Sequence, residues 1–167
     1  MSPMAEPRKT RAKDGLDRFP CQTSSFHFAN LGLVHDVAQE KKYTKDHEWV
    51  ELSDDGKMGT IGISTYAAHS LGDVVYVELP QIPMDVSGGD AIGAVESVKS
   101  ASDIMTPISG NIVEANTKLE ETPGLINREP EGATGWIAKI EIGEKGKSEW
   151  EGEELMGAEE YKSFTEE

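Results

Sequence analysis

From residue 42 onward, short runs of apolar residues are separated by Gly, Pro, Asn and Asp, a pattern typical of short β-strands joined by turns. It predicts strands at Glu48–Leu52, Met58–Ile63, Val74–Leu79, Ala91–Glu96, Asn111–Asn116 and Gly135–Ile142, with a further short apolar stretch at Ile104–Met105. The turn residues at 53–56 predict that the first two of these strands form a hairpin.

One short helix is expected within this β-rich region. Ser64 is a favourable N-cap for a helix over Thr65–Leu71, and Gly72 is a favourable residue to end it. Near the end of the chain, apolar residues fall close to helical spacing among glutamates, which predicts C-terminal helices with a break or a new start at Gly157. These apolar residues are Leu155, Met156, Tyr161 and Phe164.

Two acidic segments stand out. The first, Lys118–Pro123, is a predicted loop, and the second, Glu144–Glu153, is an acidic insert that contains Gly and Lys and precedes the last helices. Two other segments, Gly89–Glu96 and Ser109–Asn116, share a rhythm of small, apolar and acidic residues and flank Lys99 at similar distances. Such an approximate duplication favours a symmetric β-sandwich.

Composition narrows the class of protein. With 37% hydrophobic and 7% aromatic residues, the core is expected to consist mostly of Val, Ile, Leu and Ala. The basic and acidic side chains of residues 1–40 cancel, so the net charge of −15 falls on residues 41–167 and makes nucleic acid an unexpected partner. No apolar run approaches the roughly 20 residues that span a bilayer, so no membrane partner is expected. Cys21 is the only cysteine, so no internal disulfide is expected.

Residues 1–41 differ from the rest and are predicted to be an N-terminal extension: a targeting segment, which is favoured, a disordered tail or an imperfect gene start. Their Arg and Ser content fits an organelle-targeting peptide, whereas Glu6, Asp14 and Asp17 do not. The carrier domain discussed below is expected over residues 42–167.

Lys99 is the main candidate for chemistry. It lies between predicted strands among small residues at 97 and 100–102, so its amine should be accessible to a modifying enzyme. Taken alone, an exposed lysine on a hairpin is usually no more than a solvated residue. The histidines have no zinc-ligand spacing with Cys21 or with each other, and no nucleophile-elbow, phosphate-loop or dinucleotide motif is present.

The segment around Lys99 resembles the lipoylation signature of the glycine cleavage H-protein family. The similarity covers about residues 42–164 in order. It is carried by Tyr43–Val50, Ile61–Ile63, Leu71–Pro80, Glu96–Asp103, Pro107–Gly110, Pro123–Asn127, Gly135–Ile137 and Leu155–Tyr161.

The resemblance implies a mainly β, barrel-sandwich hybrid fold like that of lipoyl domains, and a carrier rather than an enzyme. It implies covalent lipoate on Lys99, placed there by lipoate-attaching enzymes. In the glycine cleavage system of one-carbon metabolism, a pyridoxal-phosphate glycine decarboxylase subunit, an aminomethyltransferase subunit that uses tetrahydrofolate, and dihydrolipoamide dehydrogenase would be its partners. The expected location is the mitochondrial matrix, with a transit peptide in the extension; the alternative is the bacterial cytoplasm.

Lipoate attached to the lysine forms a flexible lipoyl arm. In this family, the arm that carries the aminomethyl group is also thought to be protected in a cleft on the carrier. By position in the resemblance, Glu48 and Asp103 would be the acids near this cleft, and Ile63 and Leu71 its apolar wall. The segments Gln81–Gly89 and Glu144–Glu153 depart from the family pattern and put partner contacts there in doubt.

Other interpretations remain open. A biotin carrier would have methionines beside the lysine, where this chain has Val98 and Ser100. A lipoyl domain of a 2-oxo acid dehydrogenase would usually show Asp-Lys and be followed by a large acyltransferase domain. An H-like relay that hands lipoyl groups to other enzymes would need the same lysine, and a plain β-rich binding module would leave it unmodified.

Overall fold

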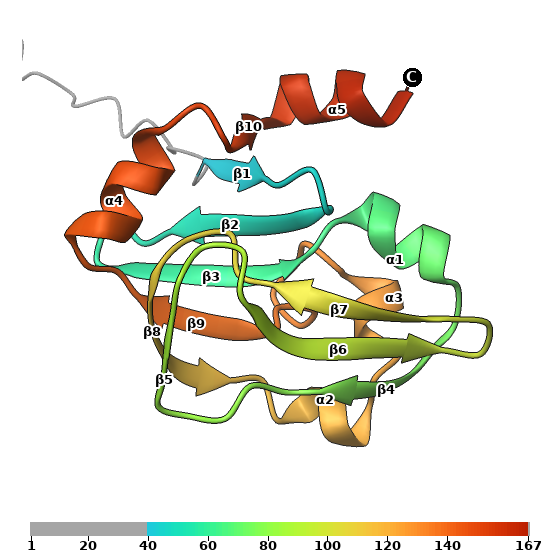
Figure 1. Cartoon of the computed structure of the whole chain (residues 1–167). Helices are drawn as coiled ribbons and strands as arrows, with labels where there is room; N and C mark the ends of the chain where they lie inside the picture. Colours follow the sequence, from blue (N-terminus) through green and yellow to red (C-terminus); the bar gives the residue numbers. More distant parts are fainter. Residues whose placement is uncertain (1–39, 167) are drawn as a thin grey trace, which may run out of the picture. The chain divides into compact units, whose positions relative to one another are not determined.

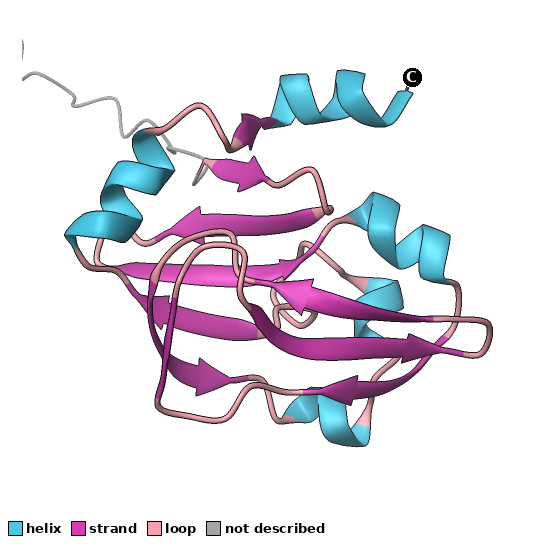
Figure 2. Cartoon of the chain, viewed as in Figure 1, coloured by secondary structure: helices cyan, strands magenta, loops and turns pink. Residues whose placement is uncertain are grey.

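The computed structural model describes residues 40–166, which form two β-sheets with short helices around them (Figure 1). One sheet has seven strands in the order β10-β1-β2-β3-β9-β8-β5, and the other has three in the order β4-β6-β7. The strands are β1 (Lys41–Tyr43), β2 (Glu48–Leu52), β3 (Met58–Ile63), β4 (Val74–Glu78), β5 (Met84–Val86), β6 (Ala91–Ser97), β7 (Ala101–Met105), β8 (Gly110–Ala115), β9 (Ala138–Glu141) and β10 (Met156–Gly157). The helices are α1 (Thr65–Leu71), α2 (Lys118–Glu121), α3 (Leu125–Arg128), α4 (Glu144–Glu151) and α5 (Ala158–Glu166), coloured cyan in Figure 2.

The predicted hairpin and the internal helix are confirmed with their predicted bounds. β2 and β3 pair in antiparallel register around the turn at residues 53–56. Ser64 caps α1 by accepting a hydrogen bond from the Ala67 backbone N–H at 3.1 Å. Gly72 ends the helix with φ of 77°, a conformation that side-chain-bearing residues rarely adopt. The local turn and cap chemistry therefore determined these elements.

The core is built mainly from aliphatic side chains, as the composition predicted. Its main cluster lies between the two sheets and includes Val50, Ile61, Val77, Val95, Ile104, Ile112 and Ile140. A smaller cluster of Tyr43, Trp49, Met156 and Tyr161 packs the end of the chain onto β1 and β2. The predicted mainly β class, with a short internal helix and C-terminal helices, is confirmed.

Met156 is not helical, contrary to the spacing-based prediction. It lies in β10 opposite Tyr43 of β1, and the C-terminal helix α5 begins only at Ala158. Burial of Met156 beside Trp49 in the smaller cluster outweighs the helical spacing of the apolar residues.

The predicted loop at residues 118–123 and the acidic insert at residues 144–153 both contain helices. Residues 118–121 form the four-residue helix α2, which buries Leu119. Residues 144–151 form α4, whose Gly146 lies against the Ser109 carbonyl: a Cβ there would stand 2.2 Å from that oxygen. The sequence prediction also missed β1 and β5, both three-residue strands too short to show a period. The predicted strand at Gly135–Ile142 is shorter in the structure, where β9 begins at Ala138.

The predicted N-terminal extension lies almost entirely outside the described residues and stays a prediction. Among residues 40–166, no helix is long and apolar enough to cross a membrane.

Candidate functional site

The turn that carries Lys99 is fixed by hydrogen bonds from its neighbours. It joins β6 to β7, where Glu96 pairs with Ala101. Within the turn, the Ser97 N–H donates to the Ser100 carbonyl at 2.7 Å, and the Ser97 hydroxyl receives the Ser100 N–H at 3.0 Å. Val98 N–H donates to the Asp73 carbonyl at 3.1 Å, which ties the turn to the start of β4. The serines beside the lysine therefore hold its backbone in place.

The Lys99 side chain is exposed and passes over Gly72. A Cβ at Gly72 would stand 3.4 Å from Lys99 Cε and 3.9 Å from Nζ. The side chain thus begins at a fixed turn and ends in solvent beside the C-terminal end of α1. This arrangement leaves a primary amine accessible at the surface.

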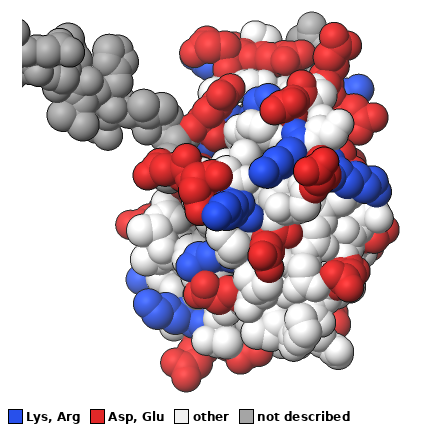
Figure 3. Space-filling model, turned by 90° about the vertical axis from the view of Figure 1, so that its left-hand side faces the viewer, with Lys and Arg blue, Asp and Glu red and all other residues white. Residues whose placement is uncertain are grey.

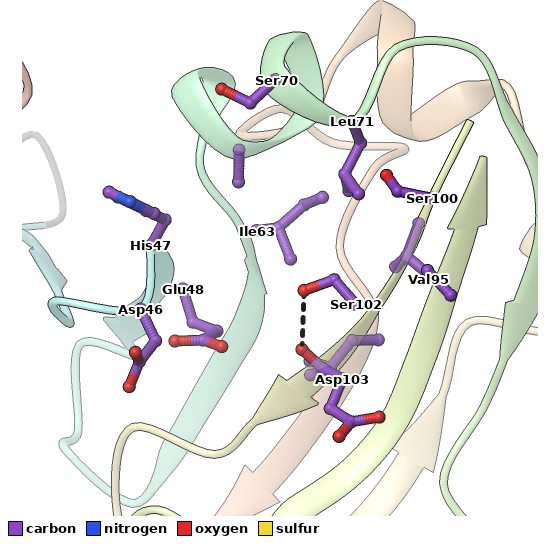
Figure 4. Close-up of a pocket in the computed structure, with 13 residues that line it drawn as sticks. Asp46, His47, Glu48, Ile63, Ser70, Leu71, Val95, Ser100, Ser102 and Asp103 are labelled. Carbon is purple, nitrogen blue, oxygen red and sulfur yellow. Dashed lines mark hydrogen bonds between the residues drawn. The ribbon is translucent and has the colours of Figure 1, made fainter. Parts of the chain in front are cut away.

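A cavity of about 320 Å³ opens beside this turn, between α1, the start of β2 and strand β7. Figure 4 shows its lining residues. Apolar side chains of Ile63, Ala67, Leu71, Val95 and Ile104 contribute to its wall, and the polar lining residues are Asp46, His47, Glu48, Ser70, Ser100, Ser102 and Asp103. Glu48, Asp103, Ile63 and Leu71, which the sequence placed near one cleft, therefore all line a single cavity.

Glu48 lies deep in this cavity, with 2% of its surface exposed. Its carboxylate accepts hydrogen bonds from the Met105 N–H at 3.1 Å and from the Thr44 hydroxyl, whose Oγ also receives the Glu48 N–H. Two donors fix its orientation. A buried and oriented carboxylate of this kind can receive an ammonium group.

Asp103 differs from Glu48 in exposure and in the direction of its side chain. It pairs with Ala94 across β6, on the exposed face of the small sheet, and Figure 4 shows its carboxylate pointing away from Glu48. Ser102, which pairs with the buried Val95, lies on the opposite side of β7 from Asp103. Strand alternation over residues 101–105 would have placed Ser102 and Ile104 together on the cavity side.

The C-terminal helix supports the cavity from outside. The hydroxyl of Tyr161 in α5 lies 2.8 Å from His47 Nδ1 and 2.7 Å from the Ser64 hydroxyl. His47 adopts a left-handed backbone conformation with φ of 74°, immediately before Glu48. Burial raises the pKa of Tyr161, so its hydroxyl is protonated at neutral pH. Sequence analysis placed Tyr161 on a helix and found no signal for this contact.

Residues 40–166 contain no group of three or more His, Cys, Asp or Glu side chains arranged to hold a metal ion. The main features are a β-sandwich, an exposed lysine on a hairpin turn held by hydrogen bonds, and a cavity beside it lined by apolar and polar side chains. Together they define the class of swinging-arm carriers, in which the protein attaches and positions a group while other proteins supply the chemistry.

The glycine cleavage H-protein family profile matches residues 41–167, and the chain belongs to this family. It is 48% identical to the glycine cleavage system H protein of Thermotoga maritima over 124 residues, which cover 74% of this chain and 94% of that protein. It is 47% identical to glycine cleavage system H protein 2, mitochondrial, of Arabidopsis thaliana over 139 residues, or 83% of this chain and 85% of that one. The crystal structure of an H protein from Mycobacterium marinum matches with a TM-score of 0.62 and 34% identity, covering 76% of this chain and 97% of that chain.

These comparisons confirm the family resemblance and the mainly β, lipoyl-domain-like fold class. They also confirm the prediction of a carrier subunit rather than an enzyme. The relatives include bacterial proteins and proteins named as mitochondrial.

Proposed function

We propose that Lys99 carries a covalently attached lipoyl group and that the chain shuttles an aminomethyl group within the glycine cleavage system. The observation that supports this most directly is the position of Lys99. It is an exposed amine on the β6–β7 hairpin, next to a cavity whose lining is part apolar and part acidic. Once attached, a lipoyl group would supply a disulfide that is reduced as it accepts the aminomethyl group.

The residues present fit such a group. Gly72 leaves room for the lysine stem, since a Cβ there would touch Lys99 Cε at 3.4 Å. Ser97 and Ser100 fix the turn without bulky side chains that would obstruct an attaching enzyme. These features support the proposal that a lipoyl group is attached to Lys99.

The cavity fits a loaded arm. Ile63 and Leu71 offer apolar contacts to a hydrocarbon chain, and Glu48 offers a buried carboxylate to an amine. A carboxylate in a poorly hydrated site binds an ammonium group more strongly than one in water. Asp103 would act from the rim, because its carboxylate faces away from Glu48.

The partners in this proposal are the glycine decarboxylase subunit, the aminomethyltransferase subunit, dihydrolipoamide dehydrogenase and lipoate-attaching enzymes. Mitochondrial and bacterial relatives support two locations, and we propose the mitochondrial matrix because the chain carries an N-terminal extension before the matched region. An H-like relay would share Lys99 but would not be loaded by the decarboxylase.

The test is intact and peptide mass analysis after incubation with lipoate, ATP and a lipoate ligase. We expect a single lipoyl addition that maps to Lys99 and is absent from Lys99→Arg, because arginine keeps the charge and lacks the acylable amine. Lys57→Arg is the matched control, since Lys57 is an exposed lysine at the β2–β3 hairpin turn. No addition at Lys99, under conditions that modify another H protein, would overturn the proposal.

Loading then separates the two carrier roles. Lipoylated protein is incubated with glycine and glycine decarboxylase, and exchange of the glycine carboxyl group with labelled bicarbonate is measured. Exchange that depends on Lys99 supports glycine cleavage, and lipoylation without exchange supports the relay role.

A further inference from the structure

One side-chain amide holds both ends of the backbone segment that supports the Lys99 turn. Asn127 of α3 accepts a hydrogen bond from the Val74 N–H at 2.9 Å through Oδ1, and its Nδ2 donates to the Gly72 carbonyl at 2.7 Å. A single orientation of the amide satisfies both contacts, because its oxygen must face an N–H and its nitrogen a carbonyl. Asn127 therefore bridges the end of α1 and the start of β4.

Asp73, the residue between these two contacts, is bonded to the turn. Its carbonyl accepts the N–H of Val98, directly before Lys99, at 3.1 Å. The bonds between the serines of the turn shape it but do not join it to α1. A continuous connection thus runs from Asn127 through the backbone of residues 72–74 to Val98 and the lysine.

The backbone at Gly72 and Asp73 is loosely packed. Gly72 has φ of 77° and the conformational freedom of glycine, and Asp73 is exposed. A cavity of about 470 Å³, whose lining includes both residues and Asn127, opens beside them. Asn127, by contrast, directly follows Ile126, which is fully buried and anchors α3 in the core. The amide therefore ties a loosely packed segment to a fixed one.

Exposure alone does not distinguish Lys99 from other lysines. Lys145 and Lys147 of α4 are also exposed. Acidic and basic side chains are interspersed on the face that carries α4 (Figure 3). Lys99 differs in lying on a hairpin turn that is hydrogen-bonded to a neighbouring segment. A fixed turn favours acylation of its amine, because holding two reacting groups in one geometry lowers the entropic cost of the reaction.

We propose that Asn127 is a positioning residue for lipoyl attachment, which holds residues 72–74 so that the turn presents the Lys99 amine in one geometry. This inference rests on the proposed function of Lys99. In the attachment step, the neutral amine attacks the carbonyl of ligase-held lipoyl adenylate. An amide bond forms, the acyl–phosphate bond breaks, AMP leaves, and the nitrogen releases a proton. Asn127 acts on this step through the backbone and takes no part in bond making.

The first test measures lipoyl transfer from a lipoate ligase preloaded with lipoyl adenylate to increasing concentrations of carrier. It gives the maximal transfer rate and the half-saturating carrier concentration separately. Asn127→Ala removes both contacts, whereas Asn127→Asp keeps an acceptor for Val74 and loses the donor to Gly72. Asn111→Ala is the matched control, since the Asn111 amide joins β8 to Asp85 of β5 in the other sheet. Circular dichroism establishes that each variant is folded.

The expected effect falls on the rate of transfer. We expect the maximal rate to fall about tenfold in Asn127→Ala, with the half-saturating concentration within about threefold of wild type, because a misplaced amine slows the chemical step more than it weakens docking. Asn127→Asp should also be slower than wild type, and Asn111→Ala should match it. Asn127 is exposed, so we expect its variants to fold, and a loss of stability in a folded protein would not change the rate in this way.

The second test needs no lipoate. Amide hydrogen exchange, followed residue by residue by NMR, compares wild type with both Asn127 variants. The Val98 N–H is bonded to Asp73 and not to Asn127, so faster exchange there reports displacement of the segment. We expect exchange at Val98 to rise about fivefold in Asn127→Ala, as at Val74, which loses its acceptor directly. The Ile142 N–H, next to β9, is the reference and should not change.

Either of two results would overturn the proposal: a maximal rate within about twofold of wild type in both Asn127 variants, or unchanged exchange at Val98 in both. Equal slowing in Asn111→Ala would also overturn it, because the effect would not be specific to the segment beside the turn. If Asn127→Ala does not fold, Asn127→Asp gives both readouts. Failure of the proposed function would appear differently, as a wild-type protein that accepts no lipoyl group at Lys99 while exchange at Val98 still responds to Asn127→Ala.

Discussion

The hydroxyl of Tyr161, in the last helix of the chain, lies 2.8 Å from Nδ1 of His47, in the turn before β2. These residues are separated by 114 positions, and their contact joins α5 to the cavity wall. Ser64 completes the arrangement. Its Oγ receives the Ala67 N–H, so its own proton is best placed on Tyr161 Oη, which leaves the Tyr161 proton for His47 Nδ1. The hydroxyl hydrogens of Ser64 and Tyr161 then each have an acceptor.

Removing this hydroxyl should destabilise the fold. We expect Tyr161→Phe to lower the free energy of unfolding by about 1–3 kcal/mol, because the buried Ser64 and the His47 ring lose a partner. Urea unfolding followed by tryptophan fluorescence measures this. Tyr66→Phe is the control, since Tyr66 also has a ring contact with His47 but is 45% exposed, and it should change stability by less than about 0.5 kcal/mol. Equal losses of unfolding free energy in the two variants would contradict a specific contribution of the Tyr161 hydroxyl.

Gly72 should be intolerant of a side chain. Its φ of 77° and ψ of −153° lie in a region that is essentially restricted to glycine. We expect Gly72→Ala to cost about 1–3 kcal/mol of unfolding free energy, measured by urea unfolding. Gly157→Ala is the matched comparison, because an added Cβ there meets nothing within 4 Å and φ is not positive. A loss no larger than that of Gly157→Ala would show that the helix end relaxes freely.

Glu48 should determine how long a loaded carrier survives. We expect Glu48→Gln to shorten the lifetime of the aminomethyl-loaded protein about tenfold in the absence of aminomethyltransferase, because the amide carries no charge to hold an ammonium group. Release of ammonia over time gives the rate. Glu51→Gln is the control on the same strand, where the carboxylate instead pairs with Lys41 at 2.6 Å near the surface. An unchanged lifetime in Glu48→Gln would remove this residue from the proposed arm site.

The sequence predicted those parts of the structure that depend on neighbouring residues. The β2–β3 hairpin and α1 follow from alternation, turn residues and the Ser64 cap, all of which act within a few positions. Strand β10 could not be predicted in this way, because it pairs with β1 from the opposite end of the described chain, and β1 is too short to show a period.

In the site, too, features set by neighbouring residues could be predicted, and features set by tertiary packing could not. Lys99 could be assigned to an exposed turn because strand signals flank it closely, whereas the family resemblance alone pointed to Glu48 and Asp103 as cleft acids. That resemblance could not give their orientations. The bond from Met105 N–H to Glu48 spans 57 positions, and it depends on how the two sheets pack. Asp103 faces outward because of its register with Ala94, which is also a tertiary property.

Stability should fall at alkaline pH through Tyr43. Burial, followed by its hydrogen bond to Glu131, raises the pKa of this phenol well above its ordinary value of 10.0. Above about pH 10 the unfolded chain therefore loses the Tyr43 proton while the folded chain keeps it, so the free energy of unfolding declines as pH rises. Each such group contributes a slope of up to about 1.4 kcal/mol per pH unit.

Urea unfolding between about pH 8 and 11 should show this decline, and Tyr43→Phe should have a shallower slope. Tyr76→Phe, at an exposed tyrosine, should keep the wild-type slope. If Tyr43→Phe also keeps the wild-type slope, the alkaline loss must come from another group, such as Tyr161, whose pKa is also raised by burial.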